Sequence, residues 1–454
     1  MTRKLLILPL LLLMAACAAP SPEVAARKTA LDALPPMKTF VTPVTTPPGR
    51  SNTDIARDFL DLSFRMESGR VLPFMTRFEG PVTVRVAGNA STSLNRDLNT
   101  LINRLRTEAA IDIRRARSGE QANITVQALP RAELQRLVPQ AACFVAPNVS
   151  SWSEYRRTRR SSAVDWTLLR SRERIAVFLP SDVSPQETRD CLHEEIAQAL
   201  GPLNDLYRLS DSVFNDDNFH AVLTGFDMLI LRAYYAPEMR NGTTRAQAAA
   251  ILPALLNRLN PAGARIASRP VKATPRAWIN AMETALGPGV SQANRIRAAL
   301  AAIEIAQNEG LNDTRLAFSQ FALGRLALGG DVKTALNAFV SAEATYANLR
   351  GAGIHRAHVT MHLAAFTLSS GQSQAALDMI NANLRTVAAA ENASLLATML
   401  MIKAEALDAL GRGAEAKSVR LDSLGWARYG FGSDQEVRTR LLDIVALSPE
   451  RPAG

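Results

Sequence analysis

The feature that most constrains the fold is a repeat in the second half of the chain. Four glycines, Gly289, Gly330, Gly371 and Gly411, follow one another at intervals of 41, 41 and 40 residues, in a region rich in Ala and Leu with helical periodicity. A helical hairpin repeated at one period can bury its apolar face only against the neighbouring hairpin. The repeat therefore predicts a helical solenoid, with an irregular Ala-rich bundle as the alternative.

One repeat unit carries a known packing pattern. After Gly330, the residues Ala335, Phe339 and Ala342 are spaced to face one side of a helix. This spacing resembles the second helix of a tetratricopeptide repeat, where small residues let two helices pack closely, although the period exceeds the usual one of about 34 residues. The resemblance implies an all-α, tetratricopeptide-like solenoid over residues 276–446, with a concave surface for partner proteins.

Residues 51–259 have a mixed pattern of helices and strands, and a Pro- and Arg-rich linker at 260–275 separates them from the repeats. Within this mixed region we expect a long helix capped by Ser184, with Pro185 in its first turn. The elements expected before this helix are a helix from residue 52, a strand at 81–88, a helix at 91–111, and strands at 123–129, 142–147 and 174–180.

The long helix contains the sequence CLHEEIAQALGPLND at 191–205. Read from Glu194, it resembles the HExxHxxGxxHD helix of metzincin zinc proteases, and Ser212–Phe214 stands where that family has its Met-turn. In metzincins two histidines one helical turn apart and a third beyond the glycine bind zinc, and the intervening glutamate is the general base. The order of elements before this helix is also that of a zincin-type domain, so the resemblance implies an α+β zincin-like fold.

The residues at the metal positions argue against zinc chemistry. By the resemblance, Glu195 takes the general-base position, and Glu194, Gln198 and Asn204 take the ligand positions. Zinc prefers imidazole and thiolate ligands, and a hard cation such as Ca²⁺ needs more oxygens than these three provide. We therefore expect vestigial positions with no catalytic residue, no metal and no cofactor. His193 lies out of register, and we expect it at the surface beside the two glutamates.

About residues 52–250 also resemble an uncharacterised family of proteobacterial lipoproteins, the domain of unknown function 2927. The family resemblance implies no known activity and does not extend to the repeats. Its core pattern is present here as Cys191, Glu194, Glu195, Gln198, Leu200, Gly201, Asn204, Asp205, Ser212 and Phe214 to Asp216.

The N-terminus has the parts of a lipoprotein signal. Basic Arg3 and Lys4 precede a short apolar run, and the segment ends in LLMAAC, which resembles a bacterial lipobox with Cys17 as the lipid-attachment residue. The alternative is an ordinary secretion signal cleaved near Ala16. We expect a signal peptide at 1–16 and a lipidated Pro- and Ala-rich linker at 17–50, so that the chain is anchored in the bacterial cell envelope. By resemblance to sorted lipoproteins, Ala18 favours the outer membrane, facing the periplasm.

Two cysteines remain beside Cys17. In an oxidising compartment, Cys143 and Cys191 predict one disulfide, with two buried free thiols as the alternative.

The chain is basic, with a formal net charge of +10. Its densest basic cluster is Arg156, Arg157, Arg159 and Arg160, which could bind an anion or form a solvated loop. Few aromatic residues lie among the basic ones, so we expect no nucleic-acid partner.

These observations favour a non-catalytic scaffold, a pseudo-metalloprotease joined to helical repeats, which is held to the membrane by its lipid and binds an unidentified envelope protein. Two alternatives stay open. One is an atypical metallopeptidase or hydrolase that uses Glu195. The other is a binder of peptidoglycan or anionic lipid.

Overall fold

The computed structural model describes residues 34–40, 45–88 and 90–448. From Pro36 onward the chain forms one compact unit. In these described ranges no helix is long and apolar enough to cross a membrane. The predicted signal peptide at 1–16, the predicted lipid-attachment residue Cys17 and much of the predicted linker at 17–50 lie outside the described residues.

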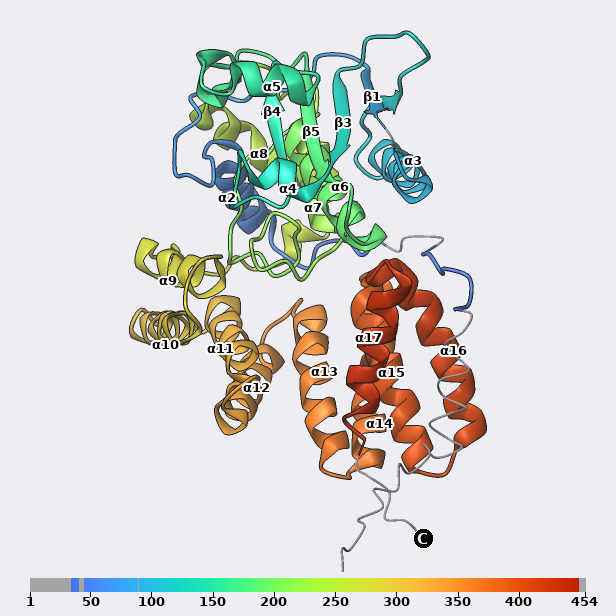
Figure 1. The fold of residues 1–454 in the computed structure, drawn as a ribbon. Coiled ribbons are helices and arrows are strands. Elements are labelled where there is room, and N and C mark those ends of the chain that lie inside the picture. The colour runs from blue at the N-terminus through green and yellow to red at the C-terminus, as the bar shows by residue number, and fades with distance from the viewer. Residues whose placement is uncertain (1–33, 41–44, 89, 449–454) are drawn as a thin grey trace, which may run out of the picture. The chain divides into compact units, whose positions relative to one another are not determined.

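The first part of the chain is a mixed α/β region built on a five-stranded sheet (Figure 1). The strand order is β2-β1-β3-β5-β4, and all neighbouring strands are parallel except the edge strand β4, which is antiparallel to β5. The elements of this region are α2 (Asn52–Ser63), β1 (Val82–Ala87), α3 (Thr92–Thr107), β2 (Ile113–Arg115), β3 (Ile124–Leu129), α4 (Arg131–Gln135), β4 (Phe144–Pro147), α5 (Trp152–Thr158), β5 (Ile175–Pro180), α6 (Pro185–Leu200), α7 (Gly225–Tyr234) and α8 (Arg245–Leu259).

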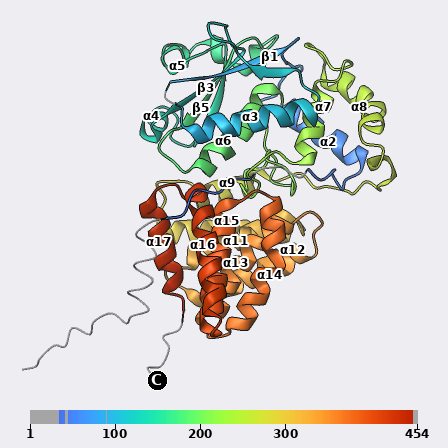
Figure 2. The same cartoon turned by 90° about the vertical axis from the view of Figure 1, so that its right-hand side faces the viewer.

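Strand β5 is buried on both faces of the sheet. Ile175, Val177 and Leu179 belong to the main hydrophobic core, together with residues of α3 and α6, which contact each other beside the sheet (Figure 2). The alternate residue Phe178 faces the other side, where its ring lies 5.2 Å from that of Trp152 in α5. Because successive side chains of a strand point to opposite faces, an all-apolar strand needs cover on both sides.

The helices expected from residue 52 and at 91–111 are present as α2 and α3, and the predicted Ser184 cap of α6 is confirmed. Ser51, Ser91 and Ser184 each accept a hydrogen bond from a backbone N–H in the first turn of α2, α3 and α6, and Pro185 opens α6. The short elements β2, α4 and α5 were not predicted. They have three to seven residues, too few for an apolar periodicity to show.

The second part of the chain is all-helical, and its helices form successive hairpins (Figure 1). Each of the four predicted glycines lies in the turn inside one hairpin, and Gly289, Gly371 and Gly411 have positive φ angles of 74°, 81° and 77°. The repeat predicted from glycine spacing is therefore confirmed. The helices are α9 (Arg276–Leu286), α10 (Gln292–Asn308), α11 (Thr314–Ala327), α12 (Val332–Ala347), α13 (Gly353–Ser369), α14 (Ser373–Ala389), α15 (Ala393–Ala409), α16 (Gly413–Gly430) and α17 (Asp434–Val445).

Small residues bring the helices of one hairpin close together. Ala335, Phe339 and Ala342 of α12 are fully buried. Across from them, Gly324 of α11 lies against the Phe339 ring so closely that a Cβ atom on this glycine would be 2.7 Å from a ring carbon. The packing role predicted for the Ala335, Phe339 and Ala342 pattern is thus present in the structure.

The loop between α6 and α7, residues 201–224, contacts the helical region. The Tyr207 ring lies 4.9 Å from that of Trp278 in α9, and a carboxylate oxygen of Asp217 lies 3.0 Å from His355 Nε2 in α13. The residues that follow α6, the helix with the metzincin-like register, are therefore held by contacts with the helical hairpins.

Candidate functional site

Helix α6 is fixed to the edge of the sheet by a disulfide. Cys191 in α6 is bonded to Cys143, the residue before β4, with a Cα–Cα distance of 5.9 Å. The disulfide predicted from the two remaining cysteines is confirmed. Strand β4 lies at the edge of the sheet and pairs only with β5. The disulfide gives it a second attachment, to the helix that carries the candidate site.

His193 is buried, and the expectation of a surface histidine was wrong. Its side chain is 3% exposed, and its Nδ1 accepts a hydrogen bond of 3.1 Å from the backbone N–H of Leu223. Burial lowers the pKa of His193 well below its usual value, and the charges of Arg104 and Arg189 lower it further. This neutral ring supports the loop before α7, outside the predicted register.

Glu194 and Glu195, at the first two positions of the register, are acids with strongly raised pKa values. Burial raises the pKa of Glu194 to about 8, and nearby Glu67 and Asp216 contribute to the same shift. Glu195 is 3% exposed, and burial followed by the charges of Glu194 and Glu67 raises its pKa well above the usual value. Its Oε2 is buried without a hydrogen-bond partner among the described residues. Desolvation and neighbouring negative charge both favour the protonated form of these groups.

Gln198 and Asn204, at the remaining ligand positions, face different surroundings. Gln198 Nε2 lies 3.5 Å from Glu67 Oε1 and 3.5 Å from Asp205 Oδ2. Asn204 Nδ2 instead donates a hydrogen bond of 2.9 Å to the backbone carbonyl of Asp61 in α2. The three predicted ligand positions therefore do not converge, and Asp205 replaces Asn204 beside Gln198.

The structure adds two carboxylates that the motif did not identify. One oxygen atom each from Glu67, Asp205 and Asp216 lies within 4.8 Å of the other two. Glu194 is their electrostatic neighbour, since its charge helps to raise the pKa of Asp205 and the charge of Asp216 helps to raise the pKa of Glu194. We call Glu67, Glu194, Asp205 and Asp216 the acidic cluster.

Sequence reasoning could not place this cluster. Glu67 lies in the turn after α2, far from α6 in the chain, and no spacing connects the two. Asp216 belongs to the core pattern of the family resemblance, which gives it no role. Burial raises its pKa to about 7, and the charges of Glu67 and Asp217 contribute. Only the folded loop brings these carboxylates to the end of α6.

The loop beyond the register is ordered by one buried carboxylate, Asp227 in α7. It accepts hydrogen bonds from Ser212 Oγ, from the Val213 N–H and from the N–H of Thr224, at 2.5, 3.1 and 2.8 Å. Burial raises the pKa of Asp227 to about 6, although these hydrogen bonds lower it. The segment at 212–214, which occupies the Met-turn position by resemblance, is therefore held in place by hydrogen bonds.

The predicted anion-binding arginines lie at the end of a short helix. Arg156 and Arg157 are in the last turn of α5, and Arg159 and Arg160 follow it. Arg156, Arg157 and Arg160 are exposed and Arg159 is partly buried. They form a basic turn at the surface, and they contribute nothing to the acidic cluster.

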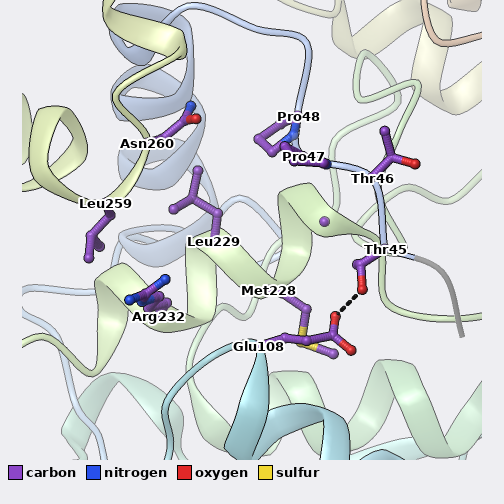
Figure 3. A pocket seen from close by; sticks show the side chains of 11 residues that line it. Thr45, Thr46, Pro47, Pro48, Glu108, Met228, Leu229, Arg232, Leu259 and Asn260 are labelled. Carbon is purple, nitrogen blue, oxygen red and sulfur yellow. Dashed lines mark hydrogen bonds between the residues drawn. The ribbon is translucent and has the colours of Figure 1, made fainter.

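A small pocket lies away from the register, between the segment at 45–48 and the helices α7 and α8 (Figure 3). Its volume is about 180 Å³, below the range of roughly 300–1,000 Å³ that is typical of small-molecule sites. Thr45 Oγ1 donates a hydrogen bond of 2.7 Å to Glu108 at its rim (Figure 3). None of the residues lining this pocket comes from 194–205, so it does not extend the candidate site.

One family model matches part of the chain. Residues 52–254 match the family model described as "Protein of unknown function (DUF2927)". The predicted match of about residues 52–250 to the domain of unknown function 2927 is therefore confirmed, and the helical repeats lie outside the match. No curated protein and no solved structure matches the chain.

Proposed function

We propose that this chain, whose α/β region matches a family of unknown function, is a non-catalytic protein-interaction scaffold of the bacterial cell envelope. In this proposal Cys17 carries a lipid that anchors the chain in the outer membrane, facing the periplasm. Residues 51–259 are a metzincin-like domain without zinc chemistry, and residues 276–446 are tetratricopeptide-like repeats that bind an envelope protein.

The orientation of Asn204 carries the non-catalytic part of the proposal. Its amide is engaged by the Asp61 carbonyl, so the third position of the register supplies no ligand. The groups of potential metal ligands among the described residues contain no histidine, and the one cysteine in them, Cys143, is in the disulfide. A catalytic zinc site needs three protein ligands, for which imidazole is the usual choice.

The order of elements supports a metzincin-like domain. A strand, a helix, further strands and then the long helix α6 follow one another as in the layout expected from the resemblance. The tight contact between Gly324 and Phe339 supports the tetratricopeptide-like assignment, because it gives the close helix packing expected of such hairpins.

Metal content and peptidase activity test the non-catalytic part. The full chain is purified from membranes in detergent, its zinc content is measured, and it is incubated with a broad peptide library. We expect neither stoichiometric zinc nor cleavage. Zinc that is lost in Glu194→Ala, or cleavage that is lost in Glu195→Gln, would overturn this part of the proposal.

Exposed apolar residues on α12 support an interaction role for the repeats. Val332, Leu336 and Val340 are 58%, 38% and 53% exposed, and their spacing of four residues puts them along one side of the helix. Apolar surface of this kind marks binding sites when it is contiguous.

The repeat region is tested by capture of cross-linked partners from membranes. We expect one envelope protein to be captured by the full chain and lost in the double variant Val332→Glu/Val340→Glu. The matched control Leu421→Glu changes an exposed apolar residue of α16 and should capture the partner as before. Equal capture by all three proteins would count against the scaffold.

The basic turn supports a second candidate function, binding of peptidoglycan or anionic lipid. Its exposed guanidinium groups can pair with phosphate or carboxylate. In co-sedimentation with peptidoglycan or with anionic vesicles, the variant with Arg156, Arg157, Arg159 and Arg160 changed to Gln should remain in the supernatant. Unchanged sedimentation would exclude this function.

A further inference from the structure

The acidic cluster concentrates negative charge with no basic side chain to balance it. Among the described residues, no ion pair joins Glu67, Glu194, Asp205 or Asp216 to an arginine, lysine or histidine. Oxygen atoms of Asp205 and Glu67 lie within 4.8 Å of each other. Ionised carboxylates this close repel each other, and a shared proton or a bound cation relieves the repulsion.

The spacing of these oxygens fits one hard cation. Ca²⁺ binds oxygens at about 2.3–2.6 Å, so two ligands on opposite sides of it are roughly 5 Å apart. Oxygens of Glu67, Asp205 and Asp216 all lie within 4.8 Å of one another, inside that limit. The side-chain amide of Gln198 lies 3.5 Å from two members of the set and can supply a further oxygen, because a rotated amide exchanges its oxygen and nitrogen positions.

A second observation points to a ligand at this place. Glu195 is 3% exposed, and its Oε2 has no hydrogen-bond partner among the described residues. One of its carboxylate oxygens lies within 4.8 Å of an oxygen of Glu194. Asp205 Oδ1 is likewise inaccessible and unpartnered in the described part of the chain. Buried polar atoms without partners are rare, and an ion or its bound water satisfies such atoms.

We propose that Glu67, Gln198, Asp205 and Asp216 bind one hard divalent cation, with Ca²⁺ preferred, and that Glu194 and Glu195 accept hydrogen bonds from water on that cation. An all-oxygen set selects Ca²⁺, Mg²⁺ or Mn²⁺ over zinc. Ca²⁺ fits best of these because it takes six to eight oxygens in flexible geometry, with carboxylates that bind through one or both oxygens. The exposed position of Glu67 leaves room for water ligands and for entry of the ion.

This cation is structural. It joins the turn after α2, the helix α6 and the loop at 201–224, which come together only in the folded protein. In that loop the Tyr207 ring lies edge-on to the Trp278 ring of the repeats, and the Tyr207 backbone carbonyl accepts a hydrogen bond from Thr314 Oγ1. The cation therefore stabilises the part of the α/β region that contacts the helical repeats. The inference rests on the proposed absence of zinc chemistry at this register.

The test is calorimetric titration of Ca²⁺ into the full chain in detergent, after removal of metals with a chelator, near neutral pH. We expect one Ca²⁺ per chain and a higher melting temperature with Ca²⁺ than with chelator, since a ligand that binds only the folded state stabilises it. Asp205→Asn and Asp216→Asn should each weaken binding by about tenfold or more, since each removes one charged ligand. The control Glu415→Gln changes an exposed carboxylate that pairs with Arg412, and should bind as the parent does.

Folding of the variants is checked in the same experiment. In chelator, Asp205→Asn and Asp216→Asn should melt no lower than the parent, because each removes a repulsive charge. Absence of binding at millimolar Ca²⁺, or equal binding by both variants and the parent, would overturn the inference. So would tighter binding of zinc than of Ca²⁺ that is lost in Glu194→Gln. Peptide cleavage by the metal-free chain would instead overturn the proposed function and leave the cation site standing.

Discussion

Asn204 and Asp205 are neighbours in sequence, but their side chains have different partners. The Asn204 amide donates to the carbonyl of Asp61 in α2, while the Asp205 carboxylate joins Glu67 and Asp216. The residue that the register assigns to the third ligand position is thus a structural bridge between α2 and the loop. The next residue belongs to the acidic cluster.

This relationship predicts which substitutions can create a zinc site. With Glu194→His and Gln198→His as background, adding Asp205→His should tighten zinc binding by about tenfold or more, since a third imidazole completes the usual ligand set. Adding Asn204→His should give no such gain. Zinc titration with a competing chromophoric chelator measures both. Tighter zinc binding by the variant with Asn204→His than by the variant with Asp205→His would contradict the placement of Asp205, rather than Asn204, beside Gln198.

The raised pKa values of the cluster predict a pH dependence of stability. The pKa of Glu194 is raised from 4.5 to about 8 and that of Asp216 from 3.8 to about 7, mainly by burial. An acid whose folded pKa is raised adds stability that is present below its unfolded pKa and lost as pH rises through the folded value. In chelator, the free energy of unfolding should therefore fall from about pH 4 to about pH 8. Urea unfolding across this range measures it.

Saturating Ca²⁺ should remove most of that decline, because the cation stabilises the ionised carboxylates that the chelated protein has to accommodate. The variant Asp216→Asn should show a smaller decline in chelator than the parent. A stability that rises over this range in chelator would contradict the burial of these acids.

The helical hairpins should be sensitive to one glycine in particular. A Cβ atom on Gly430, at the end of α16, would lie 2.5 Å from the backbone nitrogen of Ser394 and 2.6 Å from its Cα in α15. Since backbone cannot move aside cheaply, Gly430→Ala should destabilise the protein by about 1–3 kcal/mol. The matched control is Gly413→Ala, at the start of the same helix. The nearest atom to a Cβ on Gly413 would be Asp408 Oδ1, at 3.9 Å. This control should be neutral or slightly stabilising in thermal melts.

Loss of the disulfide should destabilise the edge of the sheet. The bond between Cys143 and Cys191 closes a segment with a sequence separation of 48 residues. The variant Cys143→Ser/Cys191→Ser should lose about 2–5 kcal/mol of unfolding free energy, through the constraint that the bond places on the unfolded chain. Chemical denaturation of the parent protein in reductant should show the same loss of unfolding free energy. Equal stability with and without reductant would mean that the bond is not formed.

The proposed lipid anchor predicts where the chain fractionates. Cys17→Ser removes the only thiol of the lipobox-like segment, so the chain should move from the membrane pellet to the soluble fraction on cell disruption. Cys143→Ser/Cys191→Ser should stay in the pellet, which separates lipidation from a general effect of cysteine loss. Retention of Cys17→Ser in the membrane would remove the anchor from the proposal.

The sequence by itself determined the features that depend on local periodicity. Four local predictions are confirmed: the strands expected at 81–88, 123–129, 142–147 and 174–180, the helices expected from residues 52 and 91, the helix start at Ser184, and the hairpin turns at the repeated glycines. Each follows from residues near one another in the chain. The disulfide was also predictable, since two cysteines allow one intramolecular pairing.

Only the tertiary structure decided what surrounds α6. The sequence alone shows the register from Glu194 to Asp205. Three features around it depend on how the loop at 201–224 packs: the side-chain direction of Asn204, the burial of His193, and the approach of Glu67 and Asp216. Such contacts join residues far apart in the chain, and no periodicity encodes them. The packing of this loop against α2 and the helical repeats therefore brings carboxylates together at the end of α6. Their charges and spacing favour a hard cation over zinc.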